Sequence, residues 1–152
     1  MKKIFLTSML FTTALAVTAQ RYPGQNAPLK EDILNKEYCT GMFKSADGTI
    51  LDLTGDNTSA MGYLNILDWM QGRVAGLQVY TSRNGVRIPY IHDSRASIFI
   101  DEIPVDAGFL NSLSVNDIAI VKVIRGPFAG SIGSNSAVAI YTIQEGEAEE
   151  EK

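Results

Sequence analysis

The sequence predicts an α+β domain, in which a small mixed β-sheet packs against one longer helix and short helical turns join the strands. Two observations lead to this fold class. Apolar residues recur at three- and four-residue spacing over residues 59–74, which is typical of an amphipathic helix. From Leu77 onward, short segments rich in β-branched and aromatic residues alternate with Gly, Asn, Asp or Ser, as strands alternate with turns.

The N-terminus has the composition of a secretory signal peptide. Lys2 and Lys3 precede an apolar run over residues 4–17, and Val17 and Ala19 supply small residues at the −3 and −1 positions of a cleavage site. An N-terminal membrane anchor is the alternative, but the run is shorter than the roughly 20 residues that a spanning helix needs. We therefore expect cleavage after Ala19, export, and no membrane span in the mature chain.

The mature chain is acidic and has a single cysteine. Without its two N-terminal lysines it keeps 11 basic and 17 acidic residues, a net charge of −6. This charge argues against nucleic-acid binding, which relies on attraction to phosphates. Cys39 cannot form an internal disulfide, so it is expected to be a small structural side chain or a free thiol, with an intermolecular disulfide as the less favoured option.

The segment before the helix is expected to be a leader followed by a possible hairpin. Residues 21–28 are rich in Pro, Gly, Gln and Asn, and residues 30–38 are compatible with a short helix or an irregular segment. Asp47 and Gly48 stand between two segments of mixed apolar and polar residues. An Asp-Gly pair in that setting is the strongest short-range signal for a β-hairpin.

One helix is predicted from an N-cap at Ser59 to about Val74, with Gly76 ending it. Trp69 is expected to lie in the core or half-buried on this helix rather than to serve as a ligand platform. The side chains predicted to form its buried stripe are Tyr63, Leu67, Met70 and Val74.

Strands are predicted over residues 77–82, 86–91, 96–103, 118–125 and 137–143. Pro89 predicts that the second of these is an edge strand or an irregular stretch, because proline has no N–H to donate to a neighbouring strand. Two short helical turns are expected between the third and fourth strands, at residues 109–113 and 115–117. One compact mixed sheet is expected to join Leu77, Phe99, Val121 and Ile140.

The sequence contains no residue pattern that predicts a catalytic, cofactor or metal site. His92, Asp93 and Ser94 supply the residue types of a hydrolase triad, but adjacent side chains do not converge on one point. His92 and Cys39 have no zinc-ligand spacing. The glycine-rich segment lacks the Lys-Ser/Thr of a phosphate loop and the spacing of a dinucleotide site, so it is interpreted as a tight structural turn. That turn contains Gly126, Pro127, Gly130 and Gly133.

Three segments resemble, in the right order, the plug domain of TonB-dependent outer-membrane receptors, particularly the SusC/RagA-like branch of Bacteroidetes. They are NILDWMQGRVAGLQV at residues 65–79, SIFIDEIPVD at residues 97–106, and the stretch with Arg-Gly-Pro and a Gly-Ser turn at residues 116–146. The resemblance implies a plug-like fold. It divides the chain into a signal peptide (1–19), a leader and possible hairpin (20–58), a plug-like domain (59–146) and a disordered acidic tail (147–152).

The chain also departs from the family pattern. Asp101 and Glu102 stand where the family has Asp-Gly, so a turn that favours positive φ carries a side chain at its second position. The Arg-Gly that commonly follows the second plug strand is replaced around Ile88 and Pro89. The barrel that surrounds the plug in the receptors would need at least about 220 further residues, and no convincing TonB-box segment is found near Gln20.

The resemblance implies a transport-related, non-catalytic role. We expect an exported, periplasmic protein associated with the outer membrane, which binds, occludes or gates a β-barrel supplied by another chain. Arg125 is the first candidate for partner contact, because the equivalent loop of the receptors lies near the barrel wall; a carboxylate partner inside its own domain is an equal alternative. Arg73 and Arg95 are weaker candidates.

Two other functions stay open. The first is a periplasmic ligand-binding or adaptor protein on a plug fold, which would need a concave site lined with exposed aromatic residues. The second is the remnant of a truncated transporter. The tyrosines that could contribute to a ligand site are Tyr22, Tyr38, Tyr80 and Tyr90, although no spacing groups them.

Overall fold

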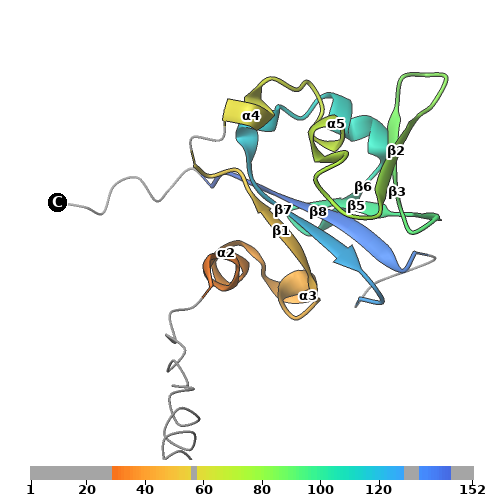
Figure 1. The fold of residues 1–152 in the computed structure, drawn as a ribbon. Helices are drawn as coiled ribbons and strands as arrows, with labels where there is room; N and C mark the ends of the chain where they lie inside the picture. The colour runs from red at the N-terminus through yellow and green to blue at the C-terminus, as the bar shows by residue number, and fades with distance from the viewer. Residues whose placement is uncertain (1–28, 56–57, 129–133, 145–152) are drawn as a thin grey trace, which may run out of the picture.

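A computed structural model of the chain describes residues 29–55, 58–128 and 134–144 (Figure 1). The predicted signal peptide at residues 1–19, the part of the leader before residue 29 and the acidic tail at residues 147–152 lie outside these residues. Gly130, Gly133 and Tyr22 lie outside them as well. None of the described helices is long and apolar enough to cross a membrane.

A five-stranded mixed sheet forms the centre of the molecule. Its strand order is β1 (Gly48–Asp52), β7 (Ile118–Arg125), β8 (Ser136–Thr142), β5 (Ser97–Ile100) and β6 (Ile103–Val105). The pair β5 and β8 is parallel and all other neighbours are antiparallel. The predicted α+β class with a mixed sheet is therefore confirmed.

Both faces of this sheet are covered, which explains why its two central strands are apolar almost throughout. On one face, Val121 and Ile140 join a core cluster with α5 and the second sheet. On the other face, Ile120 and Ala139 pack against the N-terminal helices, with Phe43 at the centre. Figure 1 shows these two layers on opposite sides of β7 and β8. Strands buried on both faces lose the alternation of a half-exposed strand.

The prediction of a single sheet is wrong for Leu77. This residue begins β2 (Leu77–Thr81), which pairs with β3 (Arg87–Ile91) in a separate three-stranded sheet that ends with the two-residue strand β4 (Ser94–Arg95). Phe99, Val121 and Ile140 do share the five-stranded sheet. Strands β2 and β3 pair with each other and not with the five-stranded sheet. The hairpin contributes to the core by burying Leu77 and Ile91.

Pro89 lies in the central strand of the second sheet, so the prediction of an edge strand or irregular stretch is wrong. Its carbonyl accepts a hydrogen bond from the Ala96 N–H at 2.9 Å, on the side of β4. The N and O atoms of one residue in an antiparallel strand face the same neighbour. The position where Pro89 lacks an N–H therefore faces β4. The pairing of β3 with β4 ends there, after the pair Tyr90 and Arg95, so no strand hydrogen bond is lost.

The hairpin predicted at Asp47 and Gly48 is also absent. The chain forms α2 (Lys30–Tyr38) and α3 (Gly41–Lys44), and β1 then pairs with β7 instead of with the preceding segment. The reason is burial: Phe43 is fully buried and meets Phe99 at 4.9 Å between ring centroids, a contact that an exposed hairpin arm would not make.

The long helix predicted from Ser59 to about Val74 is broken into α4 (Thr58–Met61) and α5 (Ile66–Met70). Asn65 adopts an extended backbone, and its side-chain oxygen accepts a hydrogen bond from the Leu67 N–H at 3.0 Å, so it caps α5. Of the predicted stripe, Leu67, Met70 and Val74 are buried, whereas Tyr63 lies in the break and is exposed.

The short helical turns are confirmed as 3₁₀ helices, η2 (Ala107–Asn111) and η3 (Val115–Asp117). Side-chain oxygens at their N-termini explain both: Asp106 accepts from the Gly108 N–H, and Ser114 accepts from the Asn116 N–H.

Candidate partner-binding surface

Arg125 ends β7 and is exposed. Its Nη1 donates to the Thr49 hydroxyl on the neighbouring strand β1 at 3.0 Å, so within the described residues its polar contact is with a neutral group and not with a carboxylate. Gly126 follows with φ of 156°, a conformation that glycine adopts readily, and Pro127 is exposed. Phe128 returns to the core against Phe43. Arg125 is therefore exposed beside the Thr49 side chain, three residues before the buried Phe128.

Arg95 lies at the same end of the molecule. The Ser134 hydroxyl is 2.8 Å from the carbonyl oxygens of both Arg95 and Ser136, and Ser136 faces Arg125 in the β7–β8 ladder. The structure thus brings two of the three predicted arginines to one end of the fold. Arg95, Ser134 and Asp106 contribute to the lining of a surface groove of about 440 Å³.

Arg73 lies apart from this pair, in the turn after α5. Its guanidinium carbon is 4.9 Å from the ring centroid of Trp69 and 5.9 Å from that of Tyr63. Its Nη1 also donates to the Trp69 carbonyl at 2.6 Å. Trp69 itself is buried, as predicted, and its indole N–H donates to the Ser59 hydroxyl at 3.2 Å.

The exposed face of the three-stranded sheet carries a pair of tyrosines. The rings of Tyr80 and Tyr90 meet edge to face, with centroids 5.1 Å apart. The Tyr80 hydroxyl donates to Oε1 of Gln78 at 2.6 Å, and these three residues with Asp93 line a shallow concavity of about 330 Å³. Alternation along β2 could have placed Gln78 and Tyr80 on one face, but Tyr90 joins them only through the register of β2 with β3. Tyr38 packs elsewhere, against the core cluster around Phe43.

The departure at Asp101 and Glu102 has a structural explanation. Both residues adopt positive φ, 48° and 66°, so this turn has the backbone conformation that glycine favours although both positions carry side chains. The Asp101 carboxylate accepts hydrogen bonds from the backbone and hydroxyl of Thr142 at 2.9 and 2.8 Å. Glu102 accepts from the Tyr141 hydroxyl at 3.3 Å. These contacts tie the turn to the end of β8.

A buried polar group that sequence reasoning missed holds the N-terminal helices to the sheet. Lys122, in the middle of β7, is almost fully buried, and its Nζ donates to Asn35 Oδ1 at 2.6 Å and to the Phe43 carbonyl at 2.7 Å. Burial lowers the pKa of Lys122 and raises the pKa of the nearby Cys39 thiol. Cys39 is a buried free thiol, as expected. A lone lysine within an apolar strand was the available signal.

The described residues contain no group of three or more His, Cys, Asp or Glu side chains placed to hold a metal ion.

Comparison with known proteins agrees with this fold. A family model described as TonB-dependent Receptor Plug Domain matches residues 44–140, well over half of the chain. None of the curated proteins compared with it matches by sequence.

Solved structures give a similar result. The structure of the RagAB peptide importer in the open-open state matches with a TM-score of 0.50 and 22% identity, over 65% of this chain and 12% of that chain. Its closed-closed state matches with a TM-score of 0.49 and 23% identity, over 63% of this chain and 12% of that chain. The chain thus spans about an eighth of the length of these neighbours, and the likeness to the open-open state concerns the fold alone.

Proposed function

The chain belongs to the family of TonB-dependent receptor plug domains, and on that premise we propose that it is an exported, non-catalytic protein that binds and occludes or gates an outer-membrane β-barrel supplied by another chain. The observation that carries the proposal is the extent of the match. Residues 44–140 run from the last residue of α3 to Ile140 near the end of β8, so the matched stretch holds nearly the whole of the five-stranded sheet.

The surface supports such contacts. The lumen of a large outer-membrane barrel is polar, so a plug meets it through hydrogen bonds and ion pairs rather than an apolar patch. Arg125 and Arg95 lie at one end of the fold, both exposed, and Arg125 donates only a neutral hydrogen bond within the described chain. A guanidinium in this state keeps most of its donors for a partner.

A co-purification experiment tests the proposal. The mature chain, tagged and exported, should be recovered with a β-barrel protein after detergent extraction of the outer membrane. Arg125→Ala should reduce that recovery while the melting temperature changes by no more than about 2 °C, because an exposed side chain contributes little to stability. Arg83→Ala, at the tip of the β2–β3 hairpin, is the matched control and should leave recovery unchanged.

Two results would contradict the proposal. Recovery of the wild-type chain only as a free soluble monomer argues against a barrel partner. A fall in melting temperature of several degrees for Arg125→Ala assigns the arginine a structural role through its bond to Thr49.

A ligand-binding or adaptor role is the second candidate, and the concavity at Tyr80 and Tyr90 favours it. Its volume of about 330 Å³ falls at the lower end of the range for small-molecule sites, and aromatic, amide and carboxylate groups line it together. A ligand for this site should raise the melting temperature of the wild-type chain by mass action and leave that of Tyr80→Ala unchanged. No shift across a panel of neutral oligosaccharides and peptides would remove this candidate.

A further inference from the structure

The β2–β3 hairpin presents two tyrosine rings that stand at right angles to each other. The planes of Tyr80 and Tyr90 meet at 89° with ring centroids 5.1 Å apart, and both residues line the concavity of about 330 Å³ on the exposed face of the three-stranded sheet. Figure 1 shows this hairpin at the periphery of the fold, beside the central sheet. Perpendicular rings do not offer a flat platform on which a sugar ring stacks. They form two adjacent walls, and a cation is attracted to an aromatic face within about 6 Å of its centroid.

A carboxylate without a partner in the described chain lies at the same concavity. Asp93 lines it from the turn between β3 and β4, where its φ is 66° and the residue is exposed. No residue that the structure describes forms a hydrogen bond or an ion pair with this carboxylate. Its negative charge is therefore available to a cationic ligand that contacts the two rings.

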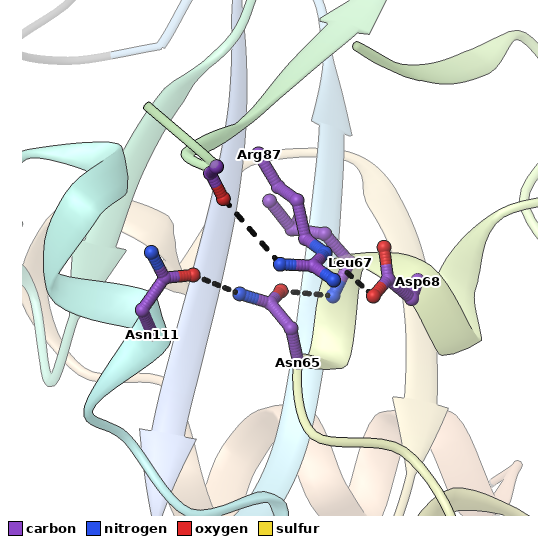
Figure 2. Close-up of polar contacts among 6 residues, drawn as sticks. Asn65, Leu67, Asp68, Arg87 and Asn111 are labelled. Carbon is purple, nitrogen blue, oxygen red and sulfur yellow. Dashed lines mark hydrogen bonds and ion pairs between the residues drawn. The ribbon is translucent and has the colours of Figure 1, made fainter. Parts of the chain in front are cut away.

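The site is ordered before a ligand arrives. The Tyr80 hydroxyl donates to Oε1 of Gln78 at 2.6 Å, which fixes the direction of the ring. On the opposite face of β3, Nε of Arg87 pairs with Asp68 of α5 at 2.5 Å, so the hairpin is tied to the body of the fold (Figure 2). Side chains held in this way lose less conformational entropy on binding than free ones do.

The surrounding charges favour a cation over an anion. Arg95 is paired with Tyr90 in the β3–β4 register, but it lines the groove beside Ser134 and not this concavity. No arginine or lysine of the described residues lies over the ring of Tyr80 or Tyr90. The chain has a net charge of −4, which raises the local concentration of cations and disfavours anionic ligands.

We propose that this concavity binds an alkylammonium group, such as that of choline or of a lysine side chain, with Tyr80 and Tyr90 contacting the alkyl carbons and Asp93 balancing the charge. The inference rests on the ligand-binding role given above as the second candidate function, and it names the chemistry of the ligand. Each of these contacts is weak at an exposed site, so the dissociation constant is expected in the millimolar range.

An NMR titration of the full mature chain with choline chloride, at constant ionic strength, tests the inference. The ring resonances of Tyr80 and Tyr90 should shift together and reach saturation. Dimethylbutanol, in which a carbon atom replaces the charged nitrogen of choline, has nearly the same shape and should bind about tenfold more weakly. Acetyl-lysine amide and its uncharged norleucine counterpart form a second pair, and the cation that binds more tightly identifies the source of the group.

Variants identify the groups that bind. Tyr80→Leu keeps an apolar side chain without a ring and should weaken choline binding about fivefold, whereas Tyr80→Phe loses only the hydrogen bond to Gln78 and should stay within about twofold of wild type. Asp93→Asn should weaken binding about threefold, because an exposed ion pair contributes little. Asp117→Asn, which changes an exposed carboxylate outside the concavity, is the matched control and should leave the affinity unchanged.

The remaining outcomes overturn the inference and separate it from the proposed functions. Equal affinity for choline and dimethylbutanol contradicts recognition of charge, and this comparison needs no variant. Unchanged choline binding by Tyr80→Leu places the cation elsewhere. If a neutral oligosaccharide shifts the Tyr80 and Tyr90 resonances and neither cation does, the inference fails while the ligand-binding candidate stands. If no ligand shifts them, both fail, and the barrel-binding proposal still depends on co-purification alone.

Discussion

At the residue scale, Asp52 illustrates how a strand end is stabilised by charge. Its carboxylate accepts hydrogen bonds from the backbone and hydroxyl of Thr54 at 2.9 and 2.6 Å and pairs with Lys30 at 2.5 Å. Burial acts to raise the pKa of Asp52, but these donors outweigh it and hold the pKa below its ordinary value of 3.8. A carboxyl whose pKa is lowered on folding contributes stability above the unfolded-state pKa and loses it as the pH falls through the folded-state pKa.

Asp52→Asn should therefore lower the free energy of unfolding by about 1 kcal/mol at pH 7, a modest amount because Lys30 is largely exposed. The difference from wild type should shrink as the pH falls below 3.8, where the wild-type carboxyl becomes protonated. Urea denaturation at pH 7 and at pH 3 measures both values. An equal difference at the two pH values would contradict an electrostatic role.

Glu102 shows a side chain that compensates for backbone strain. A φ of 66° destabilises a non-glycine residue by about 1 kcal/mol. The Glu102 carboxylate offsets part of this by accepting a hydrogen bond from the Tyr141 hydroxyl. Glu102→Gly removes both effects and should change stability by less than about 1 kcal/mol. Glu102→Ala keeps the strain and loses the contact, so it should be the less stable of the two in thermal unfolding. Equal stability of the two variants would show that the strain is negligible.

At the scale of elements, Asn65 joins the 3₁₀ helix η2 to the start of α5. Figure 2 shows its side chain between η2 and α5: Nδ2 donates to Asn111 Oδ1 at 3.1 Å, and Oδ1 accepts from the Leu67 N–H. The residue is almost fully buried. The cap explains why α5 starts at Ile66, and the contact with Asn111 ties that start to the 3₁₀ helix.

A graded series of variants tests this role. Asn65→Ala should lower the free energy of unfolding by about 2 kcal/mol, because it removes a cap and leaves the Asn111 side chain without this partner. Asn65→Asp keeps the acceptor for Leu67 and should cost less, and Asn111→Ala, which leaves the cap intact, should also cost less. Guanidinium denaturation ranks the three. If Asn111→Ala lowered the free energy of unfolding as much as Asn65→Ala does, the cap would make no contribution to stability.

Elements with a strong local signal could be predicted from the sequence, and those decided by distant contacts could not. Both 3₁₀ turns and the strands predicted at residues 77–82, 118–125 and 137–143 are confirmed because their caps and periodicity are local. The single strand predicted over residues 96–103 is wrong, because Asp101 and Glu102 form a turn that separates β5 from β6. The continuous helix was wrong because Asn65 caps a new helix where apolar spacing alone predicts continuation. The hairpin at Asp47 was wrong because β1 pairs with β7, some 70 positions away, and Phe43 is drawn into the core.

At the scale of the whole molecule, the five-stranded sheet separates two core clusters and leaves the arginines on different parts of the surface. Sequence reasoning named Arg125, Arg95 and Arg73 as partner contacts, and that role stays a prediction. It could not foresee that Ser134 links Arg95 to the end that carries Arg125, nor that Trp69 orients Arg73, because both arrangements depend on tertiary contacts. It also could not group Tyr80 with Tyr90 without the β2–β3 register.

The most direct test of the central claim is the conductance of the partner barrel in a planar lipid bilayer, measured with and without the mature chain. We expect that the barrel isolated with this chain conducts poorly, that removing the chain raises the conductance, and that adding back the wild-type chain lowers it again. Conductance that does not change when the chain is removed and restored would contradict the claim that this plug-family protein occludes a pore formed by another chain.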